Sequence, residues 1–396
     1  NFTPYKQRLI SKGADSLPRV ISIPTFRDRI TLRIICDLLT KVFHDELSIE
    51  LPQIKIEEIK NNIRKEKYDC FIKIDIASFY PNVNHEKLDK ILKSKIRKTE
   101  ILELIAKSIK NNTLPQAIKG ARLTNKKGIP QGLANSNILG EIYLHQIDSI
   151  YKRKKNIFYT RYVDDILIFC KSKKLDKLSS QLTNEFNELG LTIHPIDEAG
   201  SKSTTGNLSS SFDYLGYLFT NKVASLKHNN RLRFESSLVN LFTNFKYKHN
   251  NARTKQSKKQ AVDILNWRLD LKITGCIFDS KKRGWIFYFS QLEDLNILHE
   301  IDNVVTKLIK RFNLHSVVRP KTLVKAYHES KRIDKDTHKY IINFDTFDTA
   351  KKRKTLEMYL GQGKLKGKSD TEIDRLFKLR VRKIIEELEE DLQDFS

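Results

Sequence analysis

The pattern of apolar and polar residues predicts that the first 220 residues mix strands with helices. Alternating or continuous apolar runs rich in β-formers indicate strands, and apolar residues three to four positions apart indicate helices. The strands are expected at residues 17–24, 69–76, 158–162 and 166–170, with a further strand or hairpin at 212–219. The helices are expected at residues 27–45, 84–97, 99–111, 134–152 and 173–189. This part of the chain is therefore expected to be an α+β fold.

From about residue 230 the pattern is mainly helical, with a basic interruption at 245–259. Ser369 and Glu372 form a capping-box pattern that predicts the start of an amphipathic helix at 370–392. That helix either packs internally or mediates assembly. We expect an α+β domain at residues 1–225, a basic helical domain at 226–368 and a C-terminal helix at 369–396.

The chain is strongly basic: it contains 73 Lys and Arg but only 48 Asp and Glu, which gives a net charge of +25. So basic a chain is expected to bind a polyanion such as nucleic acid. Residues 221–368 hold 32 basic and 14 acidic residues, whereas residues 369–396 hold 5 and 9. The segment 221–368 is the candidate phosphate-binding surface. The alternative is a lysine-rich surface that only keeps the protein soluble.

The cysteines and the hydropathy indicate a cytoplasmic protein that does not cross a membrane. The four cysteines form no Cys-x-x-Cys pair and no zinc-binding spacing, which suits a reducing compartment. No apolar run reaches the roughly 18 residues that span a bilayer, and no signal peptide is visible. Because the chain begins at Asn1 and its one methionine is Met358, we expect that a native N-terminus has been removed.

Three acidic residues are the candidate catalytic group. Asp75 lies at the end of an apolar strand, and Asp164 and Asp165 lie between two apolar strands, where a hairpin turn is expected. Adjacent carboxylates repel each other unless cations neutralise them. Mg²⁺ takes hard oxygen ligands, and a two-metal site needs carboxylates that bridge both ions. Alone, each of these aspartates has an ordinary explanation as a strand end or a helix cap.

A glycine-bounded loop, Gly128–Gly132, precedes the helix expected at 134–152. Glycines at both ends allow the backbone to approach a flat ligand such as a base pair. In isolation the loop is better explained as an ordinary loop and helix start.

Taken together, these residues resemble the reverse-transcriptase superfamily. The matches follow the family's order over residues 1–220. Asp75 with Tyr80 matches motif A, Gly128–Ser136 motif B and Tyr162–Asp165 motif C; Gly190–Ile193 with Lys202 is similar to motif D, Leu215–Gly216 to the primer grip, and Arg19–Pro24 with Arg27–Arg29 to the fingers.

The resemblance implies a right-hand polymerase: fingers and palm at 1–225 with an antiparallel palm sheet, then a helical thumb and extension. It implies that two Mg²⁺ ions, with Mn²⁺ as an alternative, bind Asp75, Asp164, Asp165 and the carbonyl of Ile76. The same three aspartates would be catalytic.

The resemblance also assigns nucleotide-binding and primer-binding roles. Arg19 would contact the triphosphate, Gln131 would lie near the nascent base pair, and Lys202 would donate a proton to pyrophosphate. Tyr80 occupies the position of the steric gate that rejects the ribose 2′-hydroxyl, which implies a DNA product; its alternative role is a core aromatic. Leu215 and Gly216 would form the primer grip.

The run Gln131–Leu144 is similar to the abortive-infection and defence-associated bacterial reverse transcriptases, and segments 269–276 and 284–290 resemble the type 3 defence systems. The implied partners are a noncoding RNA template, dNTPs, the DNA product, and a second reverse transcriptase or further copies of the chain. The implied role is antiphage defence.

Three alternatives stay open. One is a template-independent or protein-primed DNA polymerase of the abortive-infection type. The others are an RNA-dependent RNA polymerase and a nucleic-acid-binding scaffold with a vestigial polymerase site.

Overall fold

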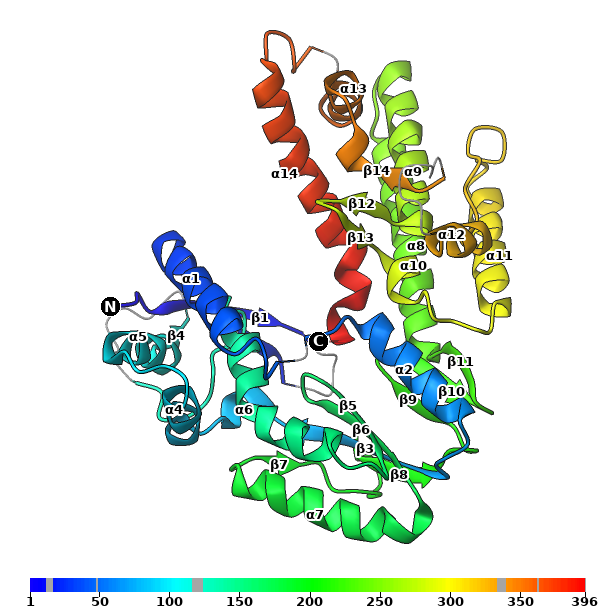
Figure 1. Cartoon of the computed structure of the whole chain (residues 1–396). Helices are drawn as coiled ribbons and strands as arrows, with labels where there is room; N and C mark the ends of the chain where they lie inside the picture. Colours follow the sequence, from blue (N-terminus) through cyan, green and yellow to red (C-terminus); the bar gives the residue numbers. More distant parts are fainter. Residues whose placement is uncertain (12–16, 48, 116–123, 333–339, 362, 396) are drawn as a thin grey trace. The chain divides into compact units, whose positions relative to one another are not determined.

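A computed structural model of the chain describes residues 1–11, 17–47, 49–115, 124–332, 340–361 and 363–395. The chain divides into two compact units, coloured along the sequence in Figure 1. The first contains residues 1–51 and 61–210, and the second contains residues 52–60 and 211–396. In the described parts of the chain, no helix has the length and apolarity needed to cross a bilayer.

The main sheet of the first unit is antiparallel and is built around β3 (Cys70–Ala77). Its strand order is β5-β6-β3-β7, with β8 also paired to β3. The strands β6 (Asp165–Cys170), β7 (Thr192–Ile193) and β8 (Thr204–Asn207) pair with β3, and β5 (Phe158–Tyr162) pairs with β6. The register of β3 with β6 runs from Cys70 opposite Cys170 to Asp75 opposite Asp165.

A smaller sheet and the helices complete the first unit. The small sheet has the order β2-β1-β4 and contains β1 (Tyr5–Ile10), β2 (Arg19–Ile23) and β4 (Thr113–Leu114). The helices are α1 (Phe26–Val42), α3 (Phe79–Asn82), α4 (His85–Lys93), α5 (Thr99–Lys110), α6 (Ser136–Lys152), α7 (Leu175–Glu188) and the 3₁₀ turn η1 (Ser172–Lys174).

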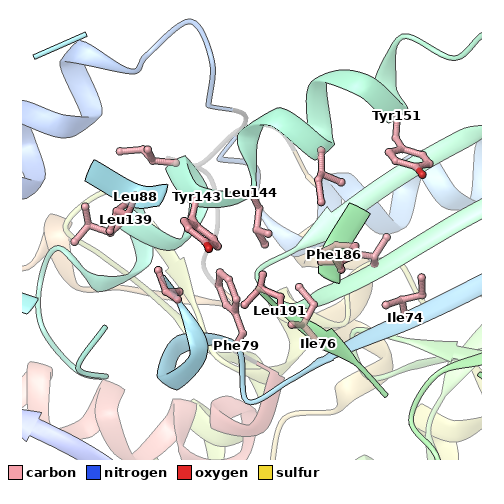
Figure 2. Packing of buried hydrophobic residues seen from close by; sticks show 14 of the residues in the cluster. Ile74, Ile76, Phe79, Leu88, Leu139, Tyr143, Leu144, Tyr151, Phe186 and Leu191 are labelled. Carbon is pink, nitrogen blue, oxygen red and sulfur yellow. The ribbon is translucent and has the colours of Figure 1, made fainter. Parts of the chain in front are cut away.

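One hydrophobic core holds the main sheet against its helices. Ile74 and Ile76 of β3 are buried, as are Phe79 just after the strand, Tyr143 of α6 and Leu191 before β7. Figure 2 shows Phe79, Tyr143 and Leu191 gathered together. Burial of such side chains stabilises the fold by about 1.5–3 kcal/mol each. The core therefore fixes the end of β3, where Asp75 lies.

The second unit is mainly helical with two small sheets. Its strands are β9 (Phe212–Tyr214), β10 (Tyr217–Thr220), β11 (Val223–Leu226), β12 (Cys276–Phe278), β13 (Lys281–Arg283) and β14 (Ile342–Asn343). Its helical segments are α8 (His228–Asn250), α9 (Lys255–Thr274), α10 (Trp285–Tyr288), α11 (Asn296–Arg311), α12 (Leu323–Ser330), η2 (Phe344–Thr346), α13 (Thr349–Leu360), α14 (Asp370–Glu389) and η3 (Glu390–Phe395). Helix α2 (Pro52–Arg64) contributes residues 52–60 to this unit.

The C-terminal helix α14 packs inside the second unit. Ile373, Phe377 and Val381 are buried in a hydrophobic cluster that also contains Phe344 and Leu356. The capping box at its start is formed as expected: Ser369 accepts from the backbone of Glu372, and the Glu372 side chain accepts from the backbone of Ser369. Of the two alternatives for this helix, the structure favours internal packing.

The predicted fold class, α+β with an antiparallel sheet followed by a mainly helical part, is confirmed. The strand β1 was not anticipated, because its residues after Tyr5 are largely exposed and do not alternate. The β12–β13 hairpin was also missed; Asp279 and Ser280 both adopt positive φ at its turn. The expected domain boundaries after residues 225 and 368 stay predictions.

Candidate active site

The three aspartates lie at one end of the main sheet, because the strand pairing brings their segments together. Asp75 is directly opposite Asp165 in the β3–β6 register, and Tyr162 is opposite Asp165 in the β5–β6 register. Val163 and Asp164 form the turn between β5 and β6. The structure thus brings together the residues that the sequence singled out 89 positions apart along the chain.

The turn that carries Asp164 adopts an unfavourable backbone conformation. Val163 has a φ of +55°, in the left-handed region that a β-branched residue rarely adopts. Strain of this kind costs about 1–3 kcal/mol and persists only where neighbouring contacts hold it. Arg161 supplies such a contact, because its Nη1 donates to the carbonyl of Val163 at 2.8 Å.

Arg161 is itself held by two carboxylates of α6. Its Nη1 and Nη2 donate to Glu141 at 3.1 and 2.7 Å, and its Nε donates to Asp148 at 2.9 Å. The Arg161 side chain is only 4% exposed. Burial alone would raise the pKa of Asp148, but the hydrogen bonds and charge of Arg161 lower it below its ordinary value. This buried network connects α6 to the turn that carries Asp164.

Asp75 is surrounded by polar groups from the segment 194–203. The Nε2 of His194 lies 3.1 Å from Oδ1 of Asp75, and the Nζ of Lys202 lies 3.8 Å from the same oxygen. The backbone N–H of His194 donates to the carbonyl of Asp75 at 3.0 Å, and the N–H of Asp75 donates to Ser203 Oγ at 3.1 Å. Both the carboxylate and the backbone of Asp75 are therefore fixed.

Asp164 has an environment that disfavours its negative charge. Burial raises the pKa of its carboxyl group, and the charge of Asp75 raises it further. The charges of Lys202 and Arg19 oppose this shift. A nearby cation would relieve the repulsion between the two carboxylates.

The donor atoms at this end of the sheet suit a hard divalent cation. The carboxylates of Asp75, Asp164 and Asp165 are oxygen donors of the kind that Mg²⁺ prefers. Within the described residues, no three His, Cys, Asp or Glu side chains are gathered closely enough to hold a metal ion. The Asp75 carboxylate instead faces His194 and Lys202. The three carboxylates are therefore the type of ligand that binds Mg²⁺. The repulsion between the carboxylates of Asp75 and Asp164, which a bound cation would relieve, supports this fit.

Tyr80 lies beside this acidic group and packs against helix α6. Its hydroxyl donates to Asn137 Oδ1 at 2.9 Å. Its ring packs against Gly140, where an added Cβ would come within 3.3 Å of Tyr80 Cε1 and 3.0 Å of Phe79 Cε1. Burial raises the pKa of Tyr80, and the charge of Asp164 adds to the shift. The gate candidate is therefore close to Asp164 and rigidly placed.

The Gly128–Gly132 loop packs between the segment after β3 and strand β2. The N–H of Ile129 donates to the carbonyl of Tyr80 at 2.8 Å, and the N–H of Ser22 donates to the carbonyl of Gln131 at 2.7 Å. Gly132 has a φ of +95°, and a Cβ there would lie 2.6 Å from Ile21 Cγ2. This packing places Gln131 next to β2, the strand that carries Arg19. The positive charge of Arg19 opposes the rise in pKa of both Asp164 and Tyr80.

Leu215 and Gly216 lie in the second unit, at the turn between β9 and β10. Both have positive φ, +46° and +82°. The carbonyl of Gly216 accepts from Asn230 Nδ2 at 2.8 Å and from the N–H of Lys227 at 3.1 Å. The turn is therefore fixed by its own unit, and its role as a primer grip stays a prediction.

Sequence reasoning missed the residues that hold the site together, namely His194 and the carboxylates that bind Arg161. A signal was present for the carboxylates. Glu141 and Asp148 are seven residues apart on a helix whose neighbouring positions are apolar and buried, so they share one face. Acidic groups on such a face require a buried cationic partner.

Comparison with known proteins agrees with the motifs. Residues 10–219, just over half of the chain, match the family model described as reverse transcriptase (RNA-dependent DNA polymerase). A curated relative, an uncharacterized 91 kDa protein in the cob intron of Schizosaccharomyces pombe, is 29% identical over 164 residues, which is 40% of this chain and 20% of that protein. The group II intron-encoded protein LtrA of Lactococcus lactis subsp. cremoris is 28% identical over 161 residues, 39% of this chain and 26% of that protein. The chain thus spans about a quarter or less of each of these relatives.

Two solved telomerase structures have a loosely similar fold. Telomerase from Candida albicans in complex with a fragment of telomeric RNA has a TM-score of 0.48 and 14% identity, over 97% of this chain and 62% of that one. Apo telomerase from Candida tropicalis has a TM-score of 0.46 and 14% identity, over 98% and 69%. Likeness at this level carries no functional argument, so the assignment rests on the family model. The chain belongs to the reverse transcriptase (RNA-dependent DNA polymerase) family.

Proposed function

We propose that this chain is an RNA-directed DNA polymerase that makes cDNA by two-metal nucleotidyl transfer. One observation carries the proposal: the β3–β6 register sets Asp75 opposite Asp165, with Asp164 at the adjoining turn. In this proposal Asp75, Asp164, Asp165 and the carbonyl of Ile76 hold two Mg²⁺ ions, or Mn²⁺ in their place. When bound, the metal ions would activate the primer hydroxyl and stabilise charge at the reacting phosphate.

The other residues of the site orient the nucleotide in this proposal. Arg19 and Lys202 place positive charge near Asp164, where a triphosphate and its pyrophosphate leaving group would need it. Lys202 then donates a proton to the pyrophosphate. The ring of Tyr80, seated against Gly140, selects a sugar without a 2′-hydroxyl. The rigid Gly128–Gly132 loop supports the new base pair beside Gln131.

The test is incorporation of labelled dNTPs on a primed RNA template in the presence of Mg²⁺. Wild-type protein is expected to extend the primer, and Asp164→Asn is expected to lose extension by several orders of magnitude. Asp176→Asn is the matched control, because Asp176 is an exposed carboxylate on α7 of the same unit. Equal activity of wild type and Asp164→Asn, or no incorporation by any protein, would refute the proposal.

The biological role we propose is antiphage defence in the bacterial cytoplasm with a noncoding RNA as template. The support is the resemblance of the Gln131–Leu144 run to defence-associated reverse transcriptases. The curated relatives are intron proteins, so an intron RNA is the competing template. Sequencing the RNA that copurifies with the chain separates the two templates. Phage plating on cells that carry wild type or Asp164→Asn tests the role, and equal plating would exclude it.

A further inference from the structure

A surface cavity of about 730 Å³ lies in the second unit, where α8 and α11 end. Helix α8 packs against both α9 and α11 (Figure 1). The residues that line the cavity include Lys246, His249 and Asn250 at the end of α8, and Arg311, Phe312 and Asn313 at the end of α11. No acidic residue is among the lining residues. The cavity is therefore a concave site of positive charge.

Two cations of this cavity are exposed and have no ion pair within the described residues, unlike Arg268 and Lys272 on α9. Lys246 and Arg311 are exposed, and neither has an ion-pair partner among the residues that the structure describes. By contrast, Arg268 and Lys272 of α9 form ion pairs with carboxylates of the C-terminal segment. The charge in the cavity is thus available to an external anion.

The two stretches of sequence that surround the cavity also contain no acidic residues. Residues 236–262 contain six Lys or Arg and no Asp or Glu. Residues 303–328 also contain six Lys or Arg and no Asp or Glu. The first stretch covers most of α8 and the start of α9, and the second covers the end of α11 and the segment after it. Two separate acid-free stretches of sequence therefore converge at one cavity. A lysine-rich surface that served only solubility would not require this convergence.

The cavity also offers groups that contact a nucleobase. The rings of Phe245 and His249 lie 5.3 Å apart at its wall, and Phe312 contributes a third ring. Asn250 and Asn313 supply exposed amides that both donate and accept hydrogen bonds. Aromatic rings beside cations are the usual means by which proteins bind single-stranded nucleic acid.

We propose that this cavity binds a single-stranded segment of RNA, with Lys246 and Arg311 on successive phosphates and one unstacked base against His249 and Phe312. This site goes beyond the proposed polymerase reaction, since it binds RNA without metal ions or dNTPs. It rests on the proposed function only in taking RNA as the ligand.

The test measures binding of the full chain to an unstructured RNA by fluorescence anisotropy, in EDTA and over a range of salt concentrations. Lys246→Ala/Arg311→Ala is expected to weaken binding and to reduce the slope of log K against log salt by about 1.4, since each single-strand phosphate contact contributes about 0.7. The charge-preserving variant Lys246→Arg/Arg311→Lys is expected to keep the wild-type slope. Lys354→Ala/Lys364→Ala, two exposed lysines of the same unit outside the cavity, is the matched control.

Several results would overturn the proposal. An equal loss in the control variant would mean that only net charge matters. Competition by AMP as effective as competition by RNA would mean that the cavity takes free nucleotides. RNA containing 4-thiouridine is expected to crosslink to peptides within 243–250 or 311–317, and crosslinks found only elsewhere would exclude the site. Repeating the measurement with Asp75→Asn separates this proposal from the polymerase, because that variant is expected to bind RNA normally while making no DNA.

Discussion

Replacing Arg161 with methionine tests the network that supports the turn at Val163 and Asp164. The substitution keeps an apolar stem of similar length but removes every hydrogen bond to Glu141, Asp148 and the Val163 carbonyl. Removing one partner of a buried ion pair costs about 3–5 kcal/mol, because the other partner stays buried and unpaired. We therefore expect the free energy of unfolding at pH 7 to fall by about that amount. Polymerase activity should fall as well, since the Val163 turn loses a contact that holds it.

The pH dependence sharpens this prediction. In the wild type the pKa of Asp148 is lowered on folding, so its contribution to stability is present above the unfolded pKa of about 3.9 and is lost as pH falls through the lower folded value. Without Arg161, burial dominates and raises that pKa, so the variant gains stability as the carboxyl is protonated. The difference between wild type and variant should therefore shrink between pH 7 and pH 4.

Urea denaturation followed by circular dichroism at several pH values measures both effects. Arg153→Met is the control, because Arg153 is an exposed arginine at the C-terminal end of α6, the helix that carries Glu141 and Asp148, and should change stability by less than about 0.5 kcal/mol. A loss below about 1 kcal/mol for Arg161→Met, or a difference that grows on acidification, would refute the reasoning.

Three further substitutions test the nucleotide site. Tyr80→Ala is expected to admit ribonucleotides, measured as the ratio of NTP to dNTP incorporation, and an unchanged ratio would remove the gate assignment. Gly140→Ala places a Cβ 3.0 Å from Phe79 and 3.3 Å from Tyr80, so it should raise the KM for dNTPs; an unaltered KM would mean that the ring position does not matter. Gly132→Ala meets Ile21 at 2.6 Å in a conformation with φ of +95°, so thermal melting should show a loss of about 1–3 kcal/mol. A melting temperature equal to that of the wild type would contradict this last expectation.

The acidic group could be predicted from the sequence because each part of it is a local pattern. An apolar strand ending in Asp75, and two apolar strands flanking Asp164 and Asp165, specify strand ends and a turn without tertiary information. The segment 212–219 was expected as a strand or hairpin, and the structure has a hairpin that turns at Leu215 and Gly216. Pairing of those strands follows from burial, and it places Asp75 opposite Asp165 beside the turn that carries Asp164.

The remaining parts of the site depend on contacts between distant elements. The approach of His194 to Asp75 leaves no periodic pattern in the sequence, because one side chain crosses between elements. For Arg161 the pattern lies only in its partners on α6, and no local pattern marks Arg161 as the cation that they bind. Strand β1 is mostly exposed, so its pairing with β2 is set by backbone hydrogen bonds rather than by alternation. Helix α2 divides between the two units, a separation that local composition does not mark.

The central claim is that this chain copies RNA into DNA at the Asp75, Asp164 and Asp165 site. Sequencing the product made on a primed RNA template of known sequence, with all four dNTPs, tests it most directly. The account predicts DNA complementary to the template, starting at the primer and absent with Asp164→Asn. DNA whose sequence is independent of the template, or that is covalently attached to the protein without the primer, would contradict it.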